Sequence, residues 1–81
     1  MTVQEATTIV YMLHTNYPQD KNVTEQELAA RINLYAVEFA DYSFAIVRDA
    51  VLHWIATSKW MPTSAELLQA CSRAAQLAAI P

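Results

Sequence analysis

The chain contains no glycine, and this absence excludes several kinds of site. The phosphate-binding loops G-x-x-x-x-G-K-[ST] and G-x-G-x-x-G both require glycine at fixed positions. The two-residue turns of tight β-hairpins require positive φ, which glycine adopts most readily. With 3 prolines in 81 residues and 54% apolar residues, the composition predicts an all-α fold, a compact bundle of about four short helices without a P-loop.

Cysteine and charge are also scarce. Cys71 is the one cysteine, so an intramolecular disulfide and a cysteine-based zinc site are excluded. Five basic and eight acidic residues give a formal net charge of −3. Domains that bind duplex DNA are normally basic with clustered Lys and Arg, so direct duplex binding is not expected. No signal peptide or bilayer-spanning run is present, so we expect a cytoplasmic protein without membrane contact.

Three threonine–glutamate pairs predict helix starts, because each has the spacing of a capping box. The pairs are Thr2–Glu5, Thr24–Glu27 and Thr63–Glu66. A fourth start follows a break in the apolar pattern, where either Asp41 or Ser43 can act as the N-cap. Apolar residues at helical spacing then predict helices over Val3–Asn16, Glu25–Ala40, Phe44–Thr57 and Ser64–Ala78.

Residues suited to catalysis or metal binding are few. The two histidines, His14 and His53, lack a paired helical ligand, and Asp49, four residues before His53, is interpreted as a helix-surface partner. Cys71 lies on an apolar stripe, where a buried, inert thiol is expected. The sequence therefore predicts no catalytic residue, no metal and no cofactor, and a protein that is not an enzyme.

Eight aromatic residues are more than four short helices bury easily. Trp60 and Met61 stand in a predicted connection directly before Pro62, and Trp and Met are enriched at the centres of interfaces. The simpler interpretation is that Trp60 folds back as a plug over the helix junction, since burying its ring would contribute about 2–3 kcal/mol. The alternative interpretation is that Trp60 contacts a partner.

A longer pattern connects these features. It begins at Tyr17-Pro18, includes the acidic and aromatic turn at residues 41–44, and is most specific at residues 59–63 with Glu66 downstream. This pattern resembles the small phage-encoded replicative helicase loader/inhibitor family. The resemblance implies an all-α adaptor of phage or prophage DNA replication in the cytoplasm of a bacterial host. Such an adaptor binds the hexameric replicative helicase, restrains its ATPase and hands it to an origin-bound replication protein.

Longer members of that family continue into a polar, poorly ordered tail implicated in helicase contact. Residues 1–81 are therefore interpreted as a single helical domain, either whole or the amino-terminal domain of a longer protein. The residues expected at the partner surface are Tyr42, Phe44, His53, Lys59, Trp60, Met61 and Pro62.

Two alternatives to the adaptor remain open. The first is a small helix-turn-helix-like DNA-binding regulator that presents the outward side of residues 44–57. In that segment Arg48 is followed by Asp49, which is a weak basis for reading bases. The second is a generic homodimerisation module with the alanine-rich last helix as its seam, because small side chains let another helix approach closely.

Overall fold

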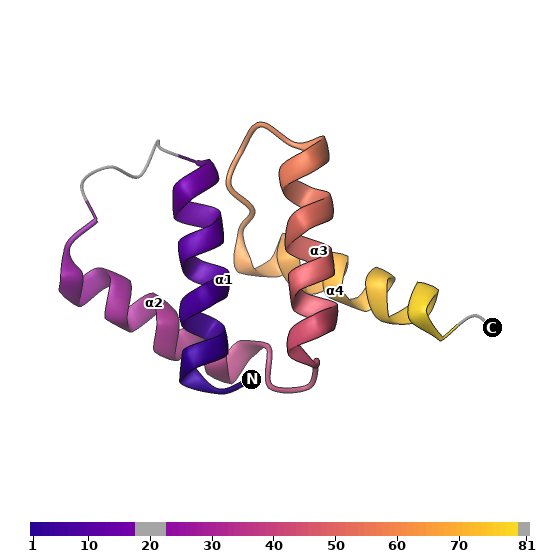
Figure 1. Ribbon diagram of the computed structural model, residues 1–81, viewed down its shortest axis with the longest axis horizontal. Helices are drawn as coiled ribbons and strands as arrows, with labels where there is room; N and C mark the ends of the chain where they lie inside the picture. Colours follow the sequence, from indigo (N-terminus) through magenta and orange to yellow (C-terminus); the bar gives the residue numbers. More distant parts are fainter. Residues whose placement is uncertain (18–22, 80–81) are drawn as a thin grey trace.

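The computed structural model describes residues 1–17 and 23–79, and over these residues the protein is all-helical (Figure 1). The elements are α1 (Val3–Asn16), α2 (Glu25–Glu38), α3 (Phe44–Thr57) and α4 (Ser64–Ala78). Helix α1 packs against α2 and α3, and α3 also packs against α4. Figure 1 shows α4 crossing α3 and extending away from α1 toward the C-terminus. The predicted all-α, four-helix architecture is confirmed.

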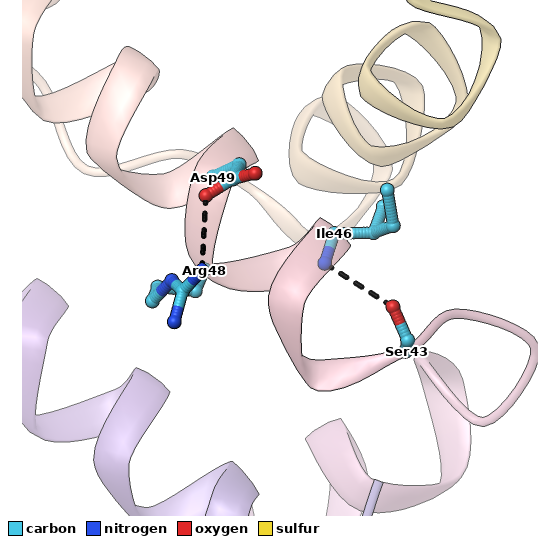
Figure 2. A network of polar contacts seen from close by, with 4 residues as sticks. All are labelled: Ser43, Ile46, Arg48 and Asp49. Atoms are coloured by element: carbon cyan, nitrogen blue, oxygen red, sulfur yellow. Dashed lines mark hydrogen bonds and ion pairs between the residues drawn. The ribbon is translucent and has the colours of Figure 1, made fainter. Parts of the chain in front are cut away.

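The helix starts follow the sequence signals. At α1 and α4 both halves of the capping box form, with the Thr2 and Thr63 hydroxyls accepting the Glu5 and Glu66 N–H groups. At α2 the Thr24 hydroxyl accepts the N–H of Glu27 at 3.1 Å. Of the two candidate caps for α3, Ser43 has this role, since its hydroxyl accepts the Ile46 N–H at 3.3 Å (Figure 2).

The predicted end of α2 at Ala40 is wrong, because the helix ends at Glu38. Phe39 still donates its N–H to the Tyr35 carbonyl at 3.0 Å, but its ψ of 20° leaves the helical range. The next turns are tighter, with the Ala40 N–H donating to the Val37 carbonyl at 3.3 Å. The full burial of Phe39 fixes this early end, since the ring packs into the core.

The core lies where α1, α2 and α3 meet, with a smaller contribution from the first half of α4. It contains Ala6, Ile9, Val10, Leu13, Tyr17, Tyr35, Phe39, Val47, Ala50, Val51, Leu67 and Cys71. The four residues predicted to face inward from α1 are all buried. Ala78, at the end of the stripe predicted for α4, is exposed because the last turns of α4 extend beyond α3.

Tyr17 joins the end of α1 to the end of α3. Its side chain is buried, and its hydroxyl donates to the Ser58 carbonyl at 2.9 Å and lies 3.4 Å from the Trp54 carbonyl. The predicted polar connection over 18–22, including Pro18 as the stop of the first helix, lies outside the described residues. Within residues 1–17 and 23–79, none of the helices combines the length and apolar character that crossing a bilayer requires.

Candidate partner-binding surface

The backbone of the connection between α3 and α4 is held at several points. The Trp54 indole N–H donates to the Trp60 carbonyl at 2.7 Å. Two residues before Trp60, the Ser58 carbonyl accepts the Tyr17 hydroxyl. Pro62 is buried, and Met61 packs half-buried against the core. The connection is therefore fixed on both sides of Trp60, although it lies between two helices.

The Trp60 side chain itself is 72% exposed, so the interpretation of this ring as a plug is wrong. The junction is filled by Met61 and Pro62, and the Trp54 ring uses its N–H on the Trp60 carbonyl. The Trp60 side chain is left facing solvent on a fixed backbone. Exposed Trp residues with restrained backbones are effective binding anchors, because little conformational freedom remains to be lost on association.

A pocket of about 300 Å³ opens between α2 and this connection. Arg31, Leu34 and Tyr35 line it from α2, and Met61, Pro62 and Ser64 line it from the other side. The Ser64 hydroxyl donates to a Glu38 carboxylate oxygen at 3.2 Å and so ties the start of α4 to α2. Burial raises the pKa of Tyr35, an effect that Arg31 opposes and Glu38 reinforces, so its phenol is neutral at pH 7.

We define the Trp60 surface as Trp60, Met61 and Leu34, the last of which is 54% exposed beside the pocket. Leu34 was not among the residues expected at the partner surface. The signal that could have identified it is its apolar side chain outside the predicted inward face of residues 25–40. Lys59, which precedes Trp60, is exposed.

Tyr42 and Phe44 lie at the opposite end of α3 from the Trp60 surface (Figure 1). A 14-residue helix is about 20 Å long, so these two groups do not form one continuous site. Both rings pack partly against the core. The Phe44 ring also lies under the guanidinium of Arg48, whose Cζ is 5.8 Å from the ring centroid, a cation–π distance.

Arg48 and His53 occupy the outer side of α3. Arg48 Nη2 lies 3.5 Å from Asp49 Oδ1, and both side chains are about half exposed (Figure 2). His53 is exposed and faces a groove toward α4 that Asp49 also lines. Among residues 1–17 and 23–79, no three His, Cys, Asp or Glu side chains gather as metal ligands do. The Arg48–Asp49 pair further reduces the positive potential that a DNA-reading helix needs.

Cys71 is fully buried in α4, as expected. Burial raises the pKa of its thiol to about 11, so the thiol is protonated at physiological pH. A nucleophilic cysteine requires the thiolate and access to substrate, and Cys71 has neither. The prediction of an inert thiol is confirmed.

Comparison with protein families assigns the chain. The model of one family, the N-terminal domain of a phage helicase loader/inhibitor, matches residues 1–68. The chain belongs to this family. The helicase loader/inhibitor domain is not itself a catalytic family. Neither the comparison with curated proteins nor the comparison with solved structures finds a match.

The extent of the loader/inhibitor N-terminal domain divides α4. The family match includes α1, α2, α3, the connection that carries Trp60, and the first residues of α4 through Leu68. The helix then continues to Ala78, beyond the matched region. All three residues of the Trp60 surface therefore lie within the family domain, whereas the projecting half of α4 does not.

Proposed function

We propose that this protein is an adaptor of phage or prophage DNA replication in the host cytoplasm. It binds the hexameric replicative helicase by protein–protein contacts, restrains it, and helps to load it with an origin-bound replication protein. The adaptor carries out no chemistry of its own and needs no cofactor. The observation that supports this proposal is the match of residues 1–68 to the helicase loader/inhibitor family.

The Trp60 surface is the proposed centre of the helicase contact. A partner side chain of moderate size fits the pocket beside Leu34 and Met61, while the Trp60 ring packs against the partner. Burying an indole ring contributes more apolar area than burying any other side chain, and here the backbone has already lost its freedom. Lys59 flanks the ring at the edge of the surface, and Pro62 fixes the backbone from within the core.

Tyr42, Phe44 and His53 are proposed as further contacts. Each has part of its side chain accessible, and they extend along α3 away from Trp60. A hexameric ring is much larger than this domain, so one helicase surface can reach both ends of α3. In the proposed mechanism, occupancy of this surface holds the ring inactive until the origin-bound protein takes it over.

A binding titration with a purified hexameric replicative helicase tests the proposed contact. We expect wild type to bind and Trp60→Ala to weaken binding by about 30-fold or more, as at a hot-spot Trp. Tyr11→Ala, which removes a 52% exposed aromatic of α1 outside the pocket, is the matched control and should bind like wild type. Circular dichroism verifies that each variant is folded. Equal affinity of the Trp60 variant and wild type would exclude this surface.

The helix-turn-helix alternative has less support. The outward face of α3 carries Arg48 paired with Asp49, and the chain has a formal net charge of −3. A duplex-binding protein would show an affinity that falls steeply as salt rises, because bound counterions are released from DNA. Titration of the protein against duplex DNA at low and high salt separates this alternative from the adaptor.

A further inference from the structure

A second and larger groove lies between α3 and α4. It has a volume of about 660 Å³, and its α3 wall includes Ala50, His53 and Trp54. Its α4 wall runs from Glu66 to Ala78, about three turns of helix. This groove is separate from the Trp60 surface, and the second half of its α4 wall lies beyond the region that matches the family.

The α4 wall suits a closely packed helix. Ala70, Ala74 and Ala78 recur at every fourth residue along it, and small side chains at that spacing allow two helix axes to approach closely. Leu77 also lines the groove and is 65% exposed, the largest apolar side chain of the projecting half of α4.

The charges of the same wall are self-complementary. Glu66 and Arg73 both line the groove and are seven residues apart, which is two turns on one helix face. Within the described residues, neither side chain forms an ion pair, although the Glu66 carboxylate accepts the Thr63 N–H at 2.9 Å. If a second α4 lies antiparallel along the groove, each Arg73 stands beside the Glu66 of the other copy.

We infer that a second copy of this chain occupies the groove and forms a twofold-symmetric dimer. In an isologous interface each contact occurs twice, so a surface that holds both an acid and a base at matching distances from the axis is complementary to itself. The pairing of Glu66 with Arg73 places the twofold axis near Gln69 and Ala70. This inference does not depend on the helicase proposal, since the two surfaces differ.

Sedimentation equilibrium of the 81-residue protein, at concentrations up to about 1 mM, tests the dimer together with charge-reversal variants. We expect wild type to dimerise, and Arg73→Glu and Glu66→Lys each to weaken self-association by about tenfold, because both symmetric pairs become repulsive. An equimolar mixture of the two variants should recover association, since in the mixed dimer both pairs are again between opposite charges or between the reversed charges of the two chains. Ser72→Glu, an exposed position of α4 outside the groove, is the control and should dimerise like wild type.

The outcomes separate the possibilities clearly. A wild-type protein that remains monomeric over the whole range overturns the inference. A dimer that Arg73→Glu leaves unchanged also overturns it, because the seam then lies elsewhere. Glu66→Lys additionally removes half of a capping box, so its helix content is measured by circular dichroism. If that variant is unfolded, Ala74→Glu takes its place, and unchanged dimerisation of Ala74→Glu contradicts the proposed seam.

Discussion

Helix α1 and the second half of α4 have similar local signals but different surroundings. Both helices start at a complete capping box, and they contain 14 and 15 residues. Helix α1 buries a residue on every turn, whereas α4 has no buried residue in positions 72–79. The capping residues decide where a helix begins, but only the neighbouring elements decide how much of it is buried.

The two ends of α4 offer the sharpest test of that difference. Leu67 is fully buried and Leu77 is 65% exposed on the same helix. We expect Leu67→Ala to lower the free energy of unfolding by about 2–5 kcal/mol through lost burial and a residual cavity. Leu77→Ala should change it by less than about 0.5 kcal/mol.

Urea unfolding followed by circular dichroism measures both values, at a protein concentration low enough to keep the chain monomeric. Comparable losses from the two substitutions would show that the end of α4 is packed in solution and would contradict the difference between the two halves. A similar experiment on Leu13, the fully buried leucine of α1, should give a loss close to that of Leu67→Ala.

The end of α1 is further fixed by Tyr17, and no such hydrogen bond from a side chain elsewhere in the fold holds the described end of α4. Tyr17→Phe keeps the ring and removes the hydroxyl that donates to the Ser58 carbonyl at 2.9 Å. We expect a loss of about 1 kcal/mol in the free energy of unfolding. Tyr11→Phe, at an exposed position on the same helix, should change it little. If both substitutions have the same effect, the Tyr17 hydrogen bond does not stabilise the fold.

Cys71 is the last buried residue of α4 and therefore marks where the packed half ends. Burial raises the pKa of its thiol from 9.0 to about 11, so above pH 9 the folded state binds more protons than the unfolded state. Stability from this group is complete below pH 9 and is lost as pH rises toward 11. Between about pH 8 and about pH 9.5 we expect the free energy of unfolding to fall by about 1 kcal/mol or less.

The readout for Cys71 is the slope of stability against pH, not stability itself. Cys71→Ala leaves a smaller core side chain and lowers stability at every pH, but it should remove the part of the slope that arises from the thiol. An unchanged slope in Cys71→Ala would show that the thiol is not buried in solution.

Much of the fold could be predicted because its determinants are local. The bounds of α1, α3 and α4 follow from threonine and serine caps together with apolar spacing, and the structure confirms them. The end of α2 could not be placed, because it depends on the burial of Phe39 among residues distant in sequence. For the same reason the exposure of Trp60 was not predicted, since Met61 and Pro62 fill the junction in its place.

The candidate surfaces are predictable only in part. The motif at residues 59–63 indicated the connection that carries Trp60, but nothing local indicated that Leu34 of α2 would lie across a pocket from Met61. Likewise, the alanine stripe of the last helix was visible in sequence, whereas the α3 wall that makes it a groove depends on how the two helices cross. Features that combine elements distant in sequence require the tertiary structure.

The ATPase rate of a purified hexameric replicative helicase, titrated with this protein, tests the adaptor role most directly. We predict that the rate falls as the protein is added and reaches a constant lower level once the helicase is saturated. Trp60→Ala should need a higher concentration to reach the same level, and Tyr11→Ala should match wild type. An ATPase rate that stays unchanged at saturating wild-type protein would contradict the restraint of the helicase.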